Sequence, residues 1–456
     1  MKWNPDYALP ASFQDRLLLF FVAAMIFMFP LAHIMAIKKA LLYLTFLLSM
    51  QSIYLALRQK NNTYLLTIGI LLLLQIWMLF ITAAVADHPI ASLMEWKGQW
   101  LPSVLCFAIG TGLAYVLSSR PHHESGRLIA MVVFIPAVLY ITINSGYVLF
   151  EMLQAGSFLS QLPGISDHKA NVGYMISILE PILIGDILLR LTQNKRLLPI
   201  SGPTSSIVFV LMLLSLLAAG ARNGIIIMLL ALLIGSLLTI KELNSKFSAR
   251  RVRRTAAGFF LIFCTFLVAA YLTDPRWKPF IATVPVAWDI DHHQAWKNRD
   301  LAELKLKYGV KGIDESTYLR IAWAHEGLRL LVAHPWGTEI GRNTFYRLES
   351  EAHGQVFGRH SHNGWIDFGL NVGFPGLLLW AAFFFSLGHA GWKAWRSQQN
   401  VIGLALLLLV IMLALRAFFD STFRDHIIQQ FMLVAGLLFS TLCLTKQNSS
   451  QDEHGS

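Results

Sequence analysis

The chain has 456 residues, of which 55% are hydrophobic and 14% charged, and its mean hydropathy is +0.54. A soluble domain carries about 25% charged residues, so this composition and its repeated uncharged runs predict an all-α integral membrane protein. The composition excludes a cytosolic enzyme, a secreted disulfide scaffold and a disordered chain, and the run lengths exclude an outer-membrane barrel. The net charge of +11 does not indicate a nucleic-acid-binding protein, because membrane proteins keep Lys and Arg in their cytoplasmic loops. All three cysteines lie in apolar runs, so no disulfide is expected.

We predict about twelve transmembrane helices. They cover residues 17–37, 40–57, 64–86, 100–118, 128–150, 172–191, 204–220, 223–240, 255–273, 368–391, 400–416 and 427–445. The first run is too long for a signal-peptide core and lacks a small-residue cleavage site, so it is expected to be a retained span. The run 197–240 contains one charge, Arg222, and as a single helix it would be about twice as long as a bilayer is thick. A turn at 220–224, rich in Gly and Asn, therefore divides it into two spans.

The distribution of Lys and Arg sets the orientation. The strongest basic segment, 241–254, lies on the same side as the N-terminus if every span crosses the membrane, so both ends are predicted to be cytoplasmic. The pair Lys38 and Lys39 opposes this scheme weakly, because it falls in an expected outside turn. The chain then divides into helices 1–9 (1–273), a long periplasmic loop region (274–367), helices 10–12 (368–446) and a polar cytoplasmic tail (447–456). Within the loop, 316–333 has helical periodicity and ends at His334-Pro335-Trp336-Gly337.

Charged residues in an apolar chain indicate where chemistry takes place. His360 and His362 lie on either side of a Ser, and Asn363 follows them just before a span. Histidine is the usual general base near neutral pH. A structural interfacial role and a pair of zinc ligands are the alternatives for these histidines, and no Cys or carboxylate motif supports zinc. Arg222 at its turn suits a phosphate clamp, and the alternative is an arginine that snorkels to the interface.

Other charged residues share the predicted outside face. Arg320 and Arg342 are candidate anion ligands, although each also fits a solvated surface charge. Arg416 has Asp420 close enough in sequence to pair with it, and Lys169 lies in the outside segment 151–171. Glu180 and Asp186 in the span 172–191 suggest a proton relay of a transporter, or polar groups lining a cleft. The sequence contains no nucleotide-binding loop.

The order of these motifs resembles the O-antigen ligase and polymerase superfamily of bacterial inner-membrane glycosyltransferases. The ligase signature is a His followed by Asn, Ser or Gln, nine residues, and Gly-x-x-Gly. Here it is represented by His362-Asn363 and the segment 373–376, Gly-Phe-Pro-Gly. The turn 220–224 is similar to the family's Ser-Arg-Gly turn, with Ala221 in place of Ser, and the segments 318–323, 334–337 and 341–345 are similar to its later motifs. The resemblance covers residues 200–380 well and the rest only by span pattern.

This resemblance implies a lipopolysaccharide-assembly enzyme in the cell inner membrane, with its active site facing the periplasm. It would move an O-antigen glycan from undecaprenyl diphosphate to a sugar hydroxyl of lipid A–core, with inversion at the anomeric carbon. His362 would be the general base, and Arg222 and Arg320 would bind the diphosphate and stabilise it as it leaves. Arg342, His360, Asn363, Lys169 and Arg416 are candidate substrate-binding residues. Two arginines can neutralise the diphosphate, so we expect no metal and no cofactor.

Three rival functions remain open. An O-antigen polymerase would transfer the same donor to another lipid-linked glycan. An O-linked protein oligosaccharyltransferase would transfer it to Ser or Thr of a protein, but such enzymes typically have a further outside domain, and this chain ends shortly after its last span. A transporter or flippase is expected to show repeated halves with matching polar residues, and only Glu180 and Asp186 fit. The complete His-Asn signature favours the ligase over the polymerase.

Overall fold

A computed structural model describes residues 12–452, apart from 32, 60, 121, 157–161, 163, 167–168, 247, 249, 310–311, 355–356 and most of 251–278. The regular structure of the described residues is helical, which confirms the all-α prediction. The elements are α1 (Phe13–Met28), α2 (Met35–Leu57), α3 (Asn62–Ala84), α4 (Pro89–Glu95), the π-helix η2 (Trp96–Trp100), α5 (Leu101–Ser118), α6 (His122–Ala155), α7 (Lys169–Gln193), α8 (Gly202–Ala218), α9 (Arg222–Lys246), α11 (Phe280–Trp288), α12 (Ala295–Asn298), α13 (Ala302–Tyr308), α14 (Glu315–Ala333), α15 (Thr344–His353), α16 (Gly364–Gln398), α17 (Val401–Arg416) and α18 (Asp425–Asp452).

Eight of the described helical segments are long and apolar enough to cross a membrane, and α8 and α17 are shorter apolar helices. The predicted ninth span, 255–273, lies outside the described residues apart from isolated positions. In α2, 22% of the most apolar window is buried inside the protein, against 89% in α7. The exposed surface of α2 and α3 carries large apolar side chains such as Leu47 and Ile76. Exposed apolar side chains along a long helix are expected where the surrounding medium is lipid.

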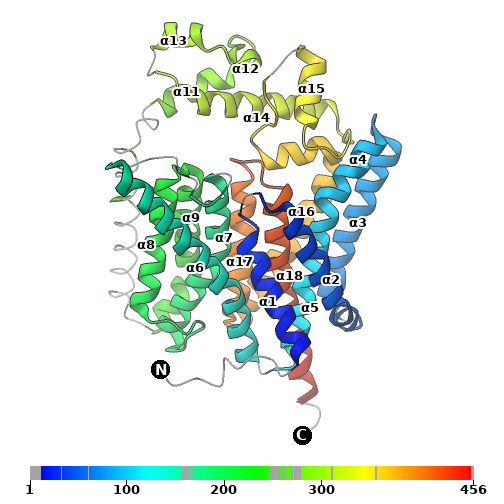
Figure 1. Ribbon diagram of the computed structural model, residues 1–456, viewed down its shortest axis with the longest axis vertical. Helices are drawn as coiled ribbons and strands as arrows, with labels where there is room; N and C mark the ends of the chain where they lie inside the picture. Colours follow the sequence, from blue (N-terminus) through cyan, green and yellow to red (C-terminus); the bar gives the residue numbers. More distant parts are fainter. Residues whose placement is uncertain are drawn as a thin grey trace.

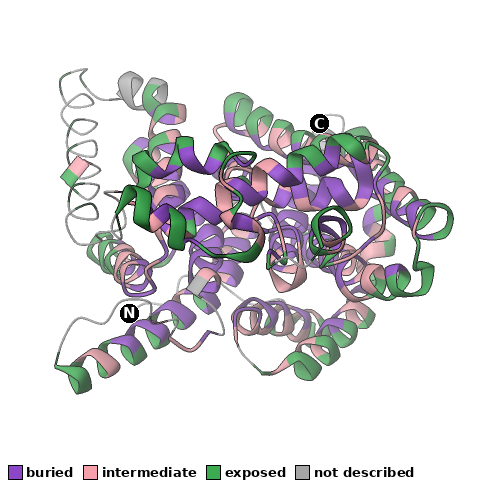
Figure 2. Ribbon diagram, turned by 90° about the horizontal axis from the view of Figure 1, so that it is seen from above, coloured by how far each residue is buried: buried purple, intermediate pink, exposed green. Residues whose placement is uncertain are grey.

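The molecule has two layers (Figure 1). The long helices form a bundle, and the short helices α11 to α15 lie across one end of it. Viewed from above that end, buried residues lie mainly in the interior, and exposed residues lie around the rim and on parts of the end layer (Figure 2). The bundle has its own large apolar core, and the end layer has a second, smaller core around Trp296, Tyr318 and Trp323. Ile366 and Leu370 of α16 belong to the second core, so α16 joins the layers.

The boundary between the first two helices differs from the prediction. We expected spans at 17–37 and 40–57, but α1 ends at Met28 and α2 begins at Met35. Lys38 is therefore in the first turns of α2 and not in a turn between spans. Its ammonium group donates to the carbonyl oxygens of Phe29 (2.8 Å) and Leu31 (2.6 Å). These carbonyls follow the end of α1, where backbone acceptors lack helical partners, so Lys38 has a structural role.

Two predictions about helix ends are confirmed. The run 197–240 is divided into α8 and α9, with Gly220 in the turn at φ 59°. Helix α14 begins after Asp314, whose side chain accepts from the backbone N–H of Thr317, and it ends at Ala333 before the predicted turn. An Asp at this position satisfies a backbone donor that the helix cannot satisfy itself.

Helix α16 has a sharp break at Gly373, where φ is 65° and ψ is −173°. A Cβ at this position would lie 2.3 Å from the carbonyl carbon of Trp336. The N–H of Phe374 donates to the Pro335 oxygen (2.8 Å), and the N–H of Thr338 donates to the Leu370 oxygen (3.1 Å). The two glycine-containing motifs at 334–337 and 373–376 thus pack against each other, and the predicted span at 368–391 is in fact a helix that begins at Gly364 and bends.

Candidate active site

The histidine motif lies where the end layer meets the bundle. His362 has a left-handed backbone, with φ 56°, a conformation that non-glycine residues rarely adopt and that is concentrated at functional sites. Asn363 then begins α16, and its Oδ1 accepts from the backbone N–H groups of Trp365 (3.0 Å) and Ile366 (3.2 Å). The predicted substrate-binding residue Asn363 therefore caps a helix, and this cap fixes the direction in which His362 leaves the backbone.

Two rings flank the His362 imidazole. The Trp323 ring of α14 stacks on it at 5.6 Å between centroids and 13° between planes, and the His360 ring lies 4.1 Å away. Trp323 is held in turn by its indole N–H, which donates to the Trp296 carbonyl (3.2 Å). His362 Nδ1 is buried and has no hydrogen-bond partner among the described residues. Stacking, rather than a carboxylate partner, therefore orients this imidazole.

Asp367 ties the histidine motif to the turn between α17 and α18. Its Oδ1 accepts from the backbone N–H of Ser361 (2.8 Å), and its Oδ2 accepts from the Ser421 hydroxyl. The N–H of Gly364 also donates to the Asp420 carbonyl (3.0 Å). The two segments, about 60 residues apart in sequence, are therefore one structural unit.

The charges around the site keep His362 neutral. Burial, together with the neighbouring His360 and Arg320, lowers the pKa of His362 to about 3. Burial and the Arg424 charge also lower the pKa of His360. Burial opposes the ionisation of Asp420, but Arg416 and Arg320 outweigh it and lower the pKa of this carboxyl. At neutral pH the site therefore holds unprotonated imidazoles beside an ionised Asp420.

Arg320 and Arg424 supply positive charge that is not locally paired. Both side chains are half-buried and influence both histidines. Among the described residues, no carboxylate lies within 4 Å of either guanidinium. A guanidinium fork matches phosphate oxygens bidentately. The centre of the site is therefore suited to an anion placed beside an imidazole.

The predicted Arg222 is docked onto the helix that carries Arg320. It is the first residue of α9, and its Nη2 lies 3.7 Å from Oδ1 of Asp314, the residue that caps α14. The ion pair connects the turn between α8 and α9 to the end layer. Two of the three predicted catalytic residues, Arg222 and Arg320, are thus connected through α14.

Arg416 lies beneath the site and is 1% exposed. Its guanidinium is 3.8 Å from the centre of the Tyr174 ring and donates to the Ala170 carbonyl (3.2 Å). The Tyr174 hydroxyl donates to Asp420 Oδ2 (3.1 Å). Such burial leaves little surface for a substrate, so Arg416 supports Asp420 from below. The Lys169 side chain lies outside the described residues.

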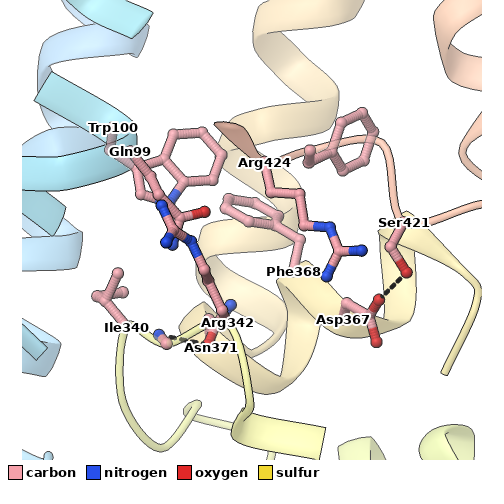
Figure 3. Close-up of a pocket in the computed structure, with 12 residues that line it drawn as sticks. Gln99, Trp100, Ile340, Arg342, Asp367, Phe368, Asn371, Ser421 and Arg424 are labelled. Carbon is pink, nitrogen blue, oxygen red and sulfur yellow. Dashed lines mark hydrogen bonds between the residues drawn. The ribbon is translucent and has the colours of Figure 1, made fainter. Parts of the chain in front are cut away.

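A pocket opens beside the histidine motif (Figure 3). Arg342 forms one wall, with its Nη2 2.6 Å from Asp425 and its Nε 3.5 Å from Glu95. Arg424 forms the opposite wall. Arg424 is not among the site residues predicted from the sequence, and its chain neighbour Asp425 pairs with Arg342. Asp367 and Trp323 were also missed, because their roles depend on contacts that periodicity does not encode.

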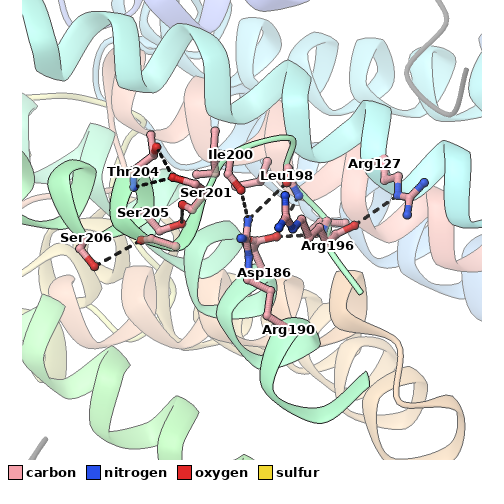
Figure 4. Close-up of polar contacts among 12 residues, drawn as sticks. Arg127, Asp186, Arg190, Arg196, Leu198, Ile200, Ser201, Thr204, Ser205 and Ser206 are labelled. Carbon is pink, nitrogen blue, oxygen red and sulfur yellow. Dashed lines mark hydrogen bonds and ion pairs between the residues drawn. The ribbon is translucent and has the colours of Figure 1, made fainter. Parts of the chain in front are cut away.

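The buried acids of α7 do not form a matched relay. Asp186 accepts from the backbone N–H groups of Leu197 (2.8 Å) and Leu198 (2.9 Å) and pairs with Arg190 (2.7 Å). Figure 4 shows this network, which fixes the loop between α7 and α8. Glu180 is fully buried, and its oxygens have no hydrogen-bond partner among the described residues. Nowhere in the described ranges do three His, Cys, Asp or Glu residues group as a metal site requires.

Comparison with known proteins adds a family match. Residues 207–381 match the family model described as O-antigen ligase. This segment contains Arg222, α14 and the histidine motif through to the end of the 373–376 motif. No curated protein gives a significant match. The match makes this segment similar to the O-antigen ligase family, whose members are glycosyltransferase-type enzymes.

Proposed function

We propose that the chain is an O-antigen ligase. It transfers a glycan from undecaprenyl diphosphate to a sugar hydroxyl of lipid A–core at the periplasmic face of the bacterial inner membrane. The observation that carries the proposal is the neutral, stacked His362 beside Arg320, whose guanidinium has no carboxylate within 4 Å among the described residues. A neutral base next to an anion site is the arrangement that transfer from a diphosphate requires.

The acceptor hydroxyl is the nucleophile of the proposed reaction. Its oxygen attacks the anomeric carbon of the donor, and His362 takes the hydroxyl proton as the new C–O bond forms. The bond between the anomeric carbon and the diphosphate oxygen breaks, and its electron pair remains on the diphosphate. A single direct displacement inverts the anomeric configuration. The proton then passes from the imidazole to solvent.

The arginines stabilise the charge that develops on the leaving diphosphate. Arg320 is the nearest candidate, because its charge already acts on His362. Arg222 approaches the same helix through Asp314, and a diphosphate with several oxygens can engage both guanidinium groups. A bound diphosphate would offset the positive charge that lowers the pKa of His362, so donor binding would strengthen the base. Electrostatic stabilisation of this kind is usually the largest catalytic term.

The proposal is tested by reconstituted transfer. Purified protein is supplied with a lipid-diphosphate glycan and rough lipopolysaccharide, with and without EDTA and in the absence of nucleotide. We expect glycan on lipid A–core, and a loss of at least about 100-fold in His362→Ala, the range of a lost general base. The matched control is His389→Ala, an exposed position on α16 far along the helix from the site, which should transfer normally.

Each alternative product contradicts the proposal in its own way. Lengthening of the lipid-linked glycan without modified lipid A–core would identify a polymerase. Transfer to Ser or Thr of an added protein would identify a protein oligosaccharyltransferase. Absence of every product with competent substrates would reopen the transporter interpretation, and loss of transfer in EDTA would contradict metal independence.

A further inference from the structure

The pocket beside the histidine motif has the composition of a carbohydrate site. Its walls come from η2, the turn at 340–342, the first half of α16 and the turn at 421–424. Besides two arginines, its polar groups are the amides of Gln99 and Asn371, the Ser421 hydroxyl and the Asp367 carboxylate, and Trp100 and Phe368 form apolar walls. Amides and carboxylates bind sugar hydroxyls, while aromatic rings pack against the apolar faces of sugar rings. A π-helix such as η2 is uncommon and is frequently found at functional sites.

The two arginines of the pocket differ in whether a carboxylate pairs with them. Figure 3 shows Arg342 beside Gln99 on one side and Arg424 on the other, with Phe368 between them. Arg342 is held by Asp425 at 2.6 Å. Arg424 has no carboxylate within 4 Å among the described residues, although it is half-buried. A half-buried guanidinium without a partner is suited to an anionic group of a ligand.

The pocket lies on the opposite flank of the site from Arg222. Arg222 begins α9, which packs on α7, α8 and α17, whereas Trp100 of η2 packs on Phe368 and Trp380 of α16. Figure 1 draws α9 and α4, the helix that leads into η2, on opposite sides of the bundle. His362 stands two residues before Gly364, which lines the pocket, and Arg222 reaches the end layer on the other flank through Asp314. A two-substrate transferase needs such an arrangement, with one substrate on each side of the base.

We propose that this pocket binds a phosphorylated or acidic sugar of the acceptor, next to the hydroxyl that His362 deprotonates. Arg424 binds the anionic group, and Gln99 and Asn371 bind hydroxyls. The inference rests on the proposed ligase function, and it assigns the two flanks to different substrates: the diphosphate on the side of Arg222 and the anionic core sugar on the side of Arg424.

The test uses lipid-free core oligosaccharide, intact or dephosphorylated, as the binding probe. Binding to the purified full-length protein is measured directly, and the KM values for acceptor and donor are measured in the transfer assay. For Arg424→Gln we expect a loss of affinity and a rise in acceptor KM of about tenfold or more with the phosphorylated probe, the range of a charge-assisted hydrogen bond. Changes with the dephosphorylated probe and in donor KM should stay within about twofold. The control is Arg329→Gln, an exposed arginine paired with Asp291.

The possible results separate the inference from the proposed function. Equal binding of both probes, or a rise in donor KM instead of acceptor KM, would overturn the acceptor assignment even if transfer proceeds. If no transfer occurs in the wild type, the ligase proposal fails. The direct binding measurement with the two probes still decides whether Arg424 binds anionic sugars. If Arg424→Gln fails to fold, Arg424→Lys replaces it, because lysine keeps the charge but loses the bidentate fork. An unchanged affinity for the phosphorylated probe in that variant, or equal binding of the two probes by the wild type, would also overturn the inference.

Discussion

At the residue scale, the site depends on supports that hold His362 in an uncommon conformation. The sequence motif identifies His362 and Asn363, and the cap that Asn363 forms could be expected from its place before a helix. The sequence does not indicate that Trp323, 39 positions earlier, stacks on the imidazole. Nor does it indicate that Arg416 is enclosed by α7 while Arg424 faces the pocket. Arginines in one short turn look alike in sequence, and only the packing of α7 and α16 distinguishes them.

Trp323 is predicted to be a positioning residue for His362. In Trp323→Leu the imidazole loses its planar support, and a small misplacement of a base can reduce the rate up to about 100-fold. We expect kcat to fall by roughly tenfold or more, with both KM values within about threefold. Trp323→Phe keeps an aromatic face and should restore much of the rate, as measured by steady-state transfer. Equal rates in the Leu and Phe variants, with both folded, would show that stacking does not position the imidazole.

At the element scale, the break in α16 explains the second half of the ligase signature. The sequence predicts a continuous span here, because apolar periodicity continues through Gly373. The structure shows that Gly373 and Gly337 let two backbones touch. This contact fixes the first half of α16, which begins directly after the histidine motif, against α14. The glycine motif at 373–376 is thus explained by a close backbone contact in the helix that follows His362.

Gly373→Ala should therefore destabilise the protein strongly. The backbone at φ 65° and ψ −173° is available essentially only to glycine, and the new Cβ would lie 2.3 to 2.5 Å from the backbone of 335–337. We expect a loss of roughly 3 kcal/mol or more, seen as a lower Tm and a smaller monodisperse fraction in detergent. Gly388→Ala is the control in the same helix, because its nearest neighbour would be 3.8 Å away. Equal behaviour of the two variants would contradict this account.

Helices α14 and α15 contain a buried acid that makes stability depend on pH. Glu349 is fully buried next to Glu326, and its oxygens have no partner among the described residues. Burial and the Glu326 charge raise the pKa of Glu349 from 4.5 to about 8. Between these values the folded chain holds a proton that the unfolded chain does not. The stability linked to this proton is complete below the unfolded pKa and is lost as pH rises through 8.

This sign gives a specific pH prediction. From pH 6 to pH 9 the wild-type Tm should fall by several degrees, and Glu349→Gln, which cannot ionise, should lose less than half as much. Glu351→Gln on the same helix is the control, because Glu351 is 58% exposed in its pair with Arg347, and it should follow the wild type. Thermal unfolding in detergent at fixed ionic strength measures all three. A Glu349→Gln curve as steep as that of the wild type would remove Glu349 as the cause.

At the scale of the whole molecule, the contacts agree with alternating spans. Segments predicted to be outside meet one another, as Arg222 meets Asp314 and Arg342 meets Asp425. At the opposite end, Arg127 donates to the Arg196 carbonyl (3.2 Å) between two segments predicted to be inside (Figure 4). Hydropathy and charge could predict this alternation because they report on the solvent around each segment. They could not predict which spans are central, since α7 and α2 are both apolar.

The orientation itself is open to a direct measurement. Leu306 in α13 is 89% exposed on the side predicted to face the periplasm, and Lys195 is exposed on the side predicted to face the cytoplasm. A membrane-impermeant maleimide should label Leu306→Cys in intact cells, and Lys195→Cys only after permeabilisation. Cys106 and Cys443 are buried and Cys264 is partly exposed, so labelling of the unsubstituted protein is measured as the background. Labelling of Lys195→Cys in intact cells, with Leu306→Cys protected, would reverse the molecule and place His362 at the cytoplasmic face. His362 would then lie on the opposite side of the membrane from an acceptor in the periplasm, which would contradict the proposed function.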